Sequence, residues 1–141
     1  PEFLRQCHDR LGPDGVLLLH TVGRLHGPAR TNTWVAKYIF PGGHSPALSE
    51  VAPVIERSGF VLSDLEVLRL HYADTLRAWR ERFLANRDAA LELYDERFCR
   101  MWEFYLASFE ASFRYDDLVV FQFQLTKRLG TAPRTRDYLY A

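Results

Sequence analysis

Apolar residues recur at helical spacing at the start of the chain and then give way to one short continuous run. The residues at helical spacing, which predict a helix over 1–11, are Phe3, Leu4, Cys7 and Leu11. Residues 12–15, Gly-Pro-Asp-Gly, are typical of a helix end followed by a tight turn. The apolar run that follows predicts a strand over 15–22 that is buried on both faces, as in a parallel sheet. This alternation of helix and buried strand favours an α/β fold.

The rest of the pattern predicts two more strands and several helices. Residues 60–70 alternate loosely between apolar and polar positions, and residues 117–127 do so strictly, which predicts two strands. The other expected elements are a loop at 24–32, a short aromatic helix or turn at 34–40, a helix at 51–59 that Ser45 or Ser49 could cap, helices at 76–83 and 98–113 with a break at 86–93, and a loose tail at 128–141.

The composition is that of one folded domain. The chain has 141 residues, of which 48% are hydrophobic and 26% charged. Lys+Arg and Asp+Glu both number 18, so the formal net charge is zero and a general nucleic-acid binder is not expected. No stretch is apolar over the roughly 18 residues that suggest a transmembrane helix. Two cysteines are too few for a disulfide scaffold, and the histidines lack the spacing of a zinc site.

Two polar residues lie where an α/β sheet usually binds ligands, beyond the carboxyl ends of its strands. His20 ends the first predicted strand. An imidazole there is a general base, an anion ligand or a donor, or else a partly buried side chain that caps a loop. Tyr72 follows the second strand, from which its hydroxyl can reach the same crevice. The alternative for Tyr72 is a packing residue at the entry of a helix that Asp74 caps.

Aromatic residues make up 14% of the chain and are concentrated on the helix predicted at 98–113. That helix also carries Phe104 and Leu106 beside its main stripe, so it has more than one apolar face and should contact both a core and something else. By spacing alone the stripe is core, and the alternative is the wall of an apolar tunnel for a lipid chain. The stripe consists of Phe98, Trp102, Tyr105, Phe109 and Phe113.

Several separated motifs follow one another in a characteristic order over residues 1–128. They are Leu18–Gly23, Trp34–Gly43, His71–Leu76 with Trp79, Tyr94–Phe98 with Met101–Leu106, and Phe113-Arg114 with Gln122. In this order and spacing the chain strongly resembles the C-terminal part of the cyclopropane-fatty-acyl-phospholipid synthases and the related mycolic acid cyclopropane synthases.

The resemblance implies the C-terminal part of a class I, Rossmann-like methyltransferase fold. Its sheet is mixed, the last strand runs antiparallel between the other two, and helices are inserted. The implied methyl donor is S-adenosylmethionine, and the implied acceptor is the cis double bond of an unsaturated phospholipid acyl chain. The resulting carbocation then loses a proton to close a cyclopropane ring.

The resemblance also implies a bound bicarbonate ion as the proton acceptor, held in this chain by His20, the backbone of Val22 and Tyr72. His20 and Tyr72 are therefore the catalytic candidates. An imidazole, a peptide N–H and a phenol are suitable donors for an anion in an apolar cleft. The residues expected to contact the acyl chain are Trp34, Tyr38, Phe40, Trp102 and Tyr105.

The resemblance makes residues 1–128 the substrate-side portion of the methyltransferase domain and 129–141 a flexible tail. Because the chain enters a helical pattern at Pro1 without a cap, we expect a C-terminal piece of a longer protein. The glycine-rich cofactor loop and the remaining anion ligands would then lie upstream, and no cofactor-binding or metal-binding residues are expected here. The expected partners are membrane phospholipid acyl chains, contacted peripherally at the cytoplasmic side of the inner membrane, and further copies of the chain.

Two other functions stay open from the sequence. Small-amine N-methyltransferases share this C-terminal pattern, although the pair His20 and Tyr72 favours an alkene acceptor. The second alternative is a non-catalytic module that binds an apolar ligand or another protein. A glycine-rich cofactor loop upstream would distinguish the enzymes from the module.

Overall fold

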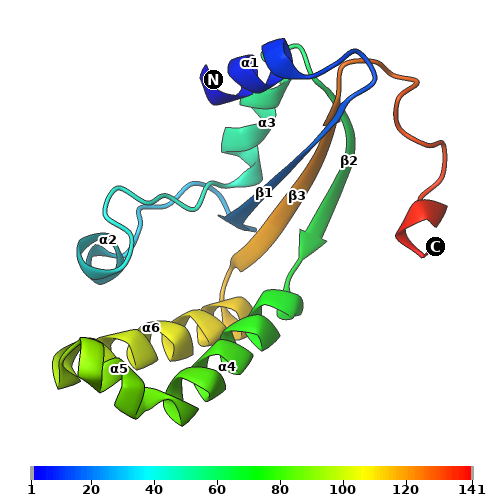
Figure 1. Ribbon diagram of the computed structural model, residues 1–141. Coiled ribbons are helices and arrows are strands. Elements are labelled where there is room, and N and C mark those ends of the chain that lie inside the picture. The colour runs from blue at the N-terminus through cyan, green and yellow to red at the C-terminus, as the bar shows by residue number, and fades with distance from the viewer. Residues whose placement is uncertain (1, 141) are drawn as a thin grey trace.

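The computed structural model describes residues 2–140 and shows an α/β chain built around one small sheet (Figure 1). In chain order its elements are α1 (Glu2–Arg10), β1 (Val16–Arg24), α2 (Thr33–Tyr38), α3 (Leu48–Glu56), β2 (Val61–Leu68), α4 (Leu70–Ala85), α5 (Arg87–Leu93), α6 (Glu96–Tyr115), β3 (Leu118–Thr126) and the 3₁₀ turn η1 (Asp137–Leu139). All three predicted strands are present.

The last strand lies in the middle of the sheet, as the family resemblance implies. The strand order is β1-β3-β2, and β3 is antiparallel to both neighbours. Along β1 the pairing runs without interruption from Val16 opposite Thr126 to Arg24 opposite Leu118. Along β2 the register shifts at Ser63, whose hydroxyl lies 3.0 Å from that of Thr126. Because β1 and β2 both oppose β3, their carboxyl ends lie at the same end of the sheet.

The alternation of side chains along β3 divides the buried residues into two clusters, one on each face of the sheet. One cluster joins β3 to α1, α3 and the start of β2, and consists of Leu4, Ile55, Phe60, Val119, Phe121, Phe123 and Leu125. The other joins β3 to α4 and α6, and consists of Ala73, Leu76, Tyr105, Leu106, Phe113, Leu118 and Val120. Figure 1 shows α1 and α3 at one end of the strands and the pair α4 and α6 at the other.

The prediction that the first strand is buried on both faces and belongs to a parallel pair is wrong for this structure. β1 is an edge strand with one antiparallel neighbour, and the side chains of Val16 and Leu18 are 49% and 58% exposed. Leu17 and Leu19, on the opposite face, pack against the cluster with α1 and α3. A continuous apolar run indicates a strand, but it does not show what covers each face.

Three local predictions about helices are also wrong. The expected break at 86–93 contains the helix α5. The N-cap of α3 is Ala47 and not a serine. The Glu50 carboxylate accepts a hydrogen bond from the Ala47 backbone N–H at 2.8 Å, so a side chain of the first turn supplies the capping interaction. Asp74 does not cap a helix, because α4 begins at Leu70, and its carboxylate instead binds Arg114 at 2.8 Å.

The C-terminal segment returns to the sheet. Its Arg136 Nε donates to the Asp64 carboxylate of β2 at 2.7 Å, and the Tyr138 hydroxyl donates to the Gln124 side chain of β3 at 3.0 Å. Within residues 2–140, no helix is long and apolar enough to cross a membrane.

Candidate functional site

A cavity of about 810 Å³ lies at the carboxyl ends of β1 and β2. Its walls come from the end of β1, the segment from Thr31 to Ser45 that includes α2, the start of α4 and one face of α6. This is the place at which open α/β sheets bind ligands, because the loops after the strands leave a crevice there.

Five of the residues singled out from the sequence border this cavity together. They come from four separate parts of the chain and are Val22, Trp34, Phe40, Tyr72 and Tyr105. Two other expected substrate contacts lie elsewhere. Tyr38 borders a second hollow beside α2, and the Trp102 ring packs between Phe98 and Tyr105 within the helical cluster. Tyr72 and Val22 thus border the same cavity, and their role in holding an anion stays a prediction.

His20 does not border the cavity. Its side chain is exposed, and its Nδ1 lies 3.2 Å from Nε2 of Gln122, its partner on β3. His20 and Val22 nevertheless lie on the same face of β1, because they are two residues apart on a strand. That face also carries Val120, which belongs to the cluster that Tyr72 packs against. The expectation that His20 and Tyr72 share one crevice is therefore not met in this structure, although His20 shares the face of β1 that carries Val22, and its role in holding an anion stays a prediction.

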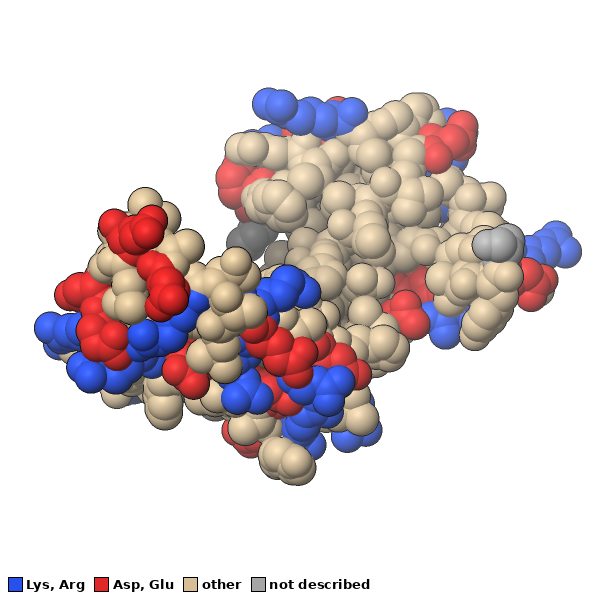
Figure 2. All heavy atoms as spheres, turned by 60° about the horizontal axis from the view of Figure 1, so that its bottom comes forward, with Lys and Arg blue, Asp and Glu red and all other residues tan. Residues whose placement is uncertain are grey.

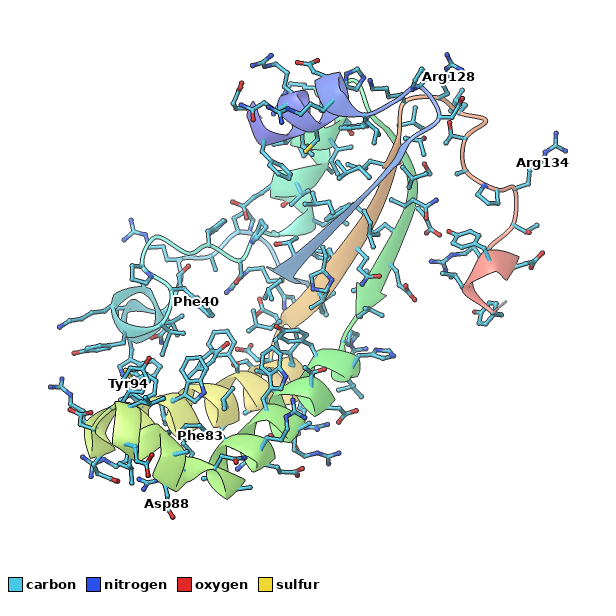
Figure 3. All side chains as sticks on the ribbon, in the orientation of Figure 1. Phe40, Phe83, Asp88, Tyr94, Arg128 and Arg134 are labelled. Atoms are coloured by element: carbon cyan, nitrogen blue, oxygen red, sulfur yellow. The ribbon has the colours of Figure 1, made fainter. Side chains whose placement is uncertain are left out.

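One part of the cavity wall is a cluster of aromatic rings, and the rest of the lining includes many polar side chains. Tyr105 lies edge-on to Phe40 at 5.6 Å and to Phe109 at 4.8 Å between ring centroids. Tyr72 contacts Phe113 at 5.0 Å, and Trp34 contacts Phe104 at 5.0 Å. Figure 3 shows Phe40 on the α2 side of the gap, opposite α6. Such rings bury an apolar ligand and present negative faces that suit a positive charge.

Burial raises the pKa of Tyr105 to about 12, and the neighbouring Tyr72 phenol adds to the effect. The cause is desolvation of the phenolate, since the Tyr105 residue is only 6% exposed. Tyr105 therefore stays neutral over the physiological range and serves as an apolar wall with one hydroxyl donor.

The cavity also has a charged corner that sequence reasoning missed. The Arg24 guanidinium lies 3.4 Å from the Asp117 carboxylate, and both side chains are largely buried. Arg24 Nε has no hydrogen-bond partner within the part of the chain that the structure describes. Sequence reasoning could not detect this pair for two reasons. Arg24 and Asp117 lie at strand ends, where charged side chains usually reach solvent, and they are 93 positions apart, so no local spacing links them.

Within residues 2–140, no three His, Cys, Asp or Glu side chains come together in a way that could hold a metal ion.

Comparisons with known proteins show which family this chain is similar to. Residues 1–123 match the family model described as mycolic acid cyclopropane synthetase. The chain is 38% identical over 133 residues to tuberculostearic acid methyltransferase UfaA1 of Mycobacterium tuberculosis, covering 90% of this chain and 31% of the relative. It is also 38% identical over 112 residues to cyclopropane-fatty-acyl-phospholipid synthase of Escherichia coli K12, covering 79% of this chain and 29% of the relative.

A solved relative shows the same architecture. The crystal structure of mycolic acid cyclopropane synthase CmaA1 complexed with SAH and CTAB superimposes with a TM-score of 0.79 at 30% identity, covering 88% of this chain and 48% of CmaA1. The chain thus spans less than half the length of each of these relatives. With the family model matched over most of its residues, the chain belongs to the mycolic acid cyclopropane synthetase family.

Proposed function

We propose that this chain forms the substrate side of an S-adenosylmethionine-dependent methyltransferase that acts on unsaturated lipid chains. The proposed reaction is transfer of a methyl group to the cis double bond of a phospholipid acyl chain, with closure of a cyclopropane ring. Membership of the family supports methylation or cyclopropanation of a lipid. The relative from E. coli, named a fatty-acyl-phospholipid synthase, supports the choice of a phospholipid.

The observation that carries the proposal is the aromatic cavity of about 810 Å³ with Tyr72 and Val22 on its wall. Its volume lies in the range of ligand sites of small molecules and lipid chains. Its aromatic wall excludes water from an alkyl chain, while Tyr72 supplies a donor within the same space. The cavity lining also carries serine and threonine hydroxyls, so the choice of a lipid chain over a small amine is supported by the family and its relatives and not by the lining.

Each side chain has a definite task in the proposed reaction. S-adenosylmethionine, when bound, supplies the methyl group. The ring faces of Tyr105 and Phe109 stabilise positive charge that develops on the acyl chain. The Tyr72 hydroxyl and the Val22 backbone hold a small anion such as bicarbonate at the cavity, where it takes up the proton. His20, on the same face of β1 but outside the cavity, is the further anion ligand that the family resemblance implies. The aromatic wall keeps water away from the cation.

Replacing Tyr72 with phenylalanine tests this assignment. In the protein that carries this chain, Tyr72→Phe should lower kcat about 10²–10³-fold, because one positioned donor is lost in the transition state. KM for oleoyl phosphatidylglycerol vesicles should change little, because the phenol holds the base and not the lipid. The matched control is Tyr140→Phe, which removes a phenol that is 88% exposed on the tail.

The outcomes separate the alternatives. Wild-type turnover in Tyr72→Phe would remove Tyr72 from the mechanism. Methyl transfer to phosphoethanolamine but not to vesicles would replace the lipid acceptor by an amine. A peripheral contact with the membrane surface, at its cytoplasmic side, belongs to the same proposal, because the acyl chain must leave the bilayer to be methylated.

A further inference from the structure

A second hollow, of about 560 Å³, opens beside the cavity, between α2 and the first half of α6. Trp34 and Phe104 border both spaces, and their rings meet edge-on at 5.0 Å. The two hollows therefore share this ring pair as part of their walls. We call the second hollow the α2–α6 groove; it is bordered by Trp34, Tyr38, Asp95, Arg97, Phe98, Arg100, Met101 and Phe104.

Two guanidinium groups and one carboxylate border the groove, and the Lys37 ammonium stands next to it on α2. Lys37, Arg97 and Arg100 form no salt bridge within residues 2–140. The one acidic residue in the groove, Asp95, caps α6, since its carboxylate accepts the Phe98 amide at 2.7 Å. Elsewhere on the helices, Arg80 and Arg114 both bind the Glu110 carboxylate.

The outer face of the helices is shown in Figure 2. Charged side chains of both signs lie intermingled over the lobe formed by α4, α5 and α6, at the lower left. At the groove, by contrast, the pKa of the Tyr38 phenol is lowered by the Lys37 ammonium, which stands next to the groove, and by the Arg97 guanidinium on its border. The same Lys37 ammonium lies 5.0 Å from the centre of the Tyr38 ring. The groove thus combines unpaired cations with aromatic surface.

The sequence places these groups on one face of α6. Arg97, Arg100 and Phe104 are separated by three and four residues, so they form one row along the helix. Phe104 is 58% exposed at the inner end of the row, next to the cavity, and the two arginines stand at the outer end. The row therefore runs from an apolar entrance to a cationic surface, which matches the order of groups along a lipid.

We propose that the α2–α6 groove binds the phosphate of an anionic glycerophospholipid, one of whose acyl chains passes between Trp34 and Phe104 into the cavity. This inference rests on the proposed function, because it takes the acyl cavity as given. Arg97 and Arg100 provide N–H donors in the fork geometry that suits phosphate oxygens, and Lys37 adds a point charge. Trp34 and Tyr38 provide the amphipathic rings that favour a lipid–water boundary.

The experiment compares the double variant Arg97→Gln/Arg100→Gln with Arg57→Gln/Arg134→Gln in the protein that carries this chain. All four arginines are exposed and form no salt bridge within residues 2–140, and Arg134 lies on the tail, far from α2 (Figure 3). Two substrates are used: vesicles of dioleoyl phosphatidylglycerol, and monoolein, which has the same chain but no phosphate, in neutral detergent micelles.

We expect the groove variant to raise KM for phosphatidylglycerol about tenfold, since two partly exposed ion pairs are lost. Its kcat and its KM for monoolein should stay at wild-type values, and the control variant should match the wild type on both substrates. An unchanged KM for phosphatidylglycerol, or an equal rise with monoolein, would overturn the inference. The inference would also be overturned if the double variant raised KM only for an oleoyl chain attached to an acidic protein and not for phosphatidylglycerol.

Sedimentation with phosphatidylglycerol vesicles distinguishes this inference from the proposed function. The wild type should sediment with the vesicles, and the groove variant should do so about tenfold more weakly. If no lipid is methylated but vesicle binding still depends on Arg97 and Arg100, the proposed reaction is wrong and the assignment of the α2–α6 groove as a phosphate site still holds. If binding is the same in both variants, the groove assignment fails whether or not methyl transfer occurs.

Discussion

Tyr105 and Tyr72 border the same cavity, yet burial acts most strongly on Tyr105. The Tyr105 phenol is enclosed by Phe40, Phe109 and the ring of Trp102, so its ionised form loses water without gaining a cation. A pKa of about 12 follows from that desolvation, with Tyr72 as the second cause. Because burial in the cavity wall raises the Tyr105 pKa, the free energy of unfolding should depend on pH in the alkaline range.

The first residue-scale prediction concerns the alkaline limb of stability. The unfolded chain releases the Tyr105 proton near pH 10 and the folded chain near pH 12, so Tyr105 favours folding fully below pH 10 and loses this effect between pH 10 and 12. The free energy of unfolding of the wild type should fall, relative to Tyr105→Phe, by about 1.4 kcal/mol per pH unit in that window. Urea titrations of both proteins from pH 9 upward measure it, and parallel pH curves would contradict the prediction.

The second residue-scale prediction concerns Gly23, at the end of β1. A Cβ added there would overlap the ring of buried Phe121 and lie 2.8 Å from the carbonyl oxygen of Pro46. The hydrogen bond from the Arg24 amide to that carbonyl, at 3.1 Å, holds the loop before α3 against the strand. Gly23→Ala should therefore lower the free energy of unfolding by about 1–3 kcal/mol through overpacking.

Gly27→Ala is the control for Gly23→Ala, because a Cβ at Gly27 meets nothing within 4 Å. Urea unfolding of both variants gives the comparison. Equal stability of the two variants would mean that the approach of the Pro46 loop to β1 is looser than the structure shows.

At the scale of elements, a chain of ion pairs joins α4 to α6. The Arg114 guanidinium binds Asp74 of α4 at 2.8 Å and Glu110 of α6 at 3.0 Å, and Arg80 binds Glu110 at 3.3 Å. These contacts hold α6, which carries one wall of the cavity, at a set position against α4, which carries Tyr72.

The prediction at this scale concerns acid stability. The hydrogen bond from Arg114 lowers the pKa of Asp74 below its ordinary value of 3.8. A lowered pKa stabilises the fold above 3.8, and the effect is lost as the pH falls through the folded pKa. Asp74→Asn should thus lower the urea midpoint at pH 7, and its difference from the wild type should disappear as the pH falls below 3.8.

Asp88→Asn serves as the control for Asp74→Asn. Asp88 lies on α5 with no cation within 4 Å in residues 2–140, and its side chain points away from the other helices (Figure 3). Its substitution should leave the acid limb of the stability curve unchanged. The same pH dependence in both variants would show that the network contributes nothing specific to α4 and α6.

At the scale of the whole molecule, the sheet has an unpaired edge along β1. Val16 and Leu18 are 49% and 58% exposed, and β1 has β3 as its one neighbour in the described residues. An unpaired edge strand with exposed apolar side chains favours association with another strand or chain. This edge is where self-association of the 141-residue chain is expected.

The prediction is that the 141-residue chain self-associates as its concentration rises, and that Leu18→Lys shifts it toward monomer. A charge on an edge strand opposes pairing with another strand. Sedimentation velocity over a dilution series measures the shift. Leu129→Lys is the control, because that leucine is 86% exposed on the C-terminal segment outside the sheet. An equal effect of both substitutions would place the contact elsewhere.

The sequence by itself determined the three strands, the helices α1, α3 and α6, and the family. Local periodicity is enough for these elements, because the side-chain period of a strand or helix depends on neighbours in the chain. The motifs around His20, Trp34 and Tyr72 were enough for the family, and this resemblance, not periodicity, implied the central position of β3. The predicted cavity residues Val22, Trp34 and Tyr105 came from the same motifs.

Only the tertiary structure decided which face of each element is covered. The apolar run of β1 reads as doubly buried, yet one face is exposed, because burial depends on segments far away in the chain. For the same reason Trp102 packs inside the helical cluster while Phe104, two residues on, faces the cavity. The pair Arg24 and Asp117, and the unpaired arginines 97 and 100, likewise become visible only when distant segments are brought together, since a charge's partner is set by its spatial neighbours.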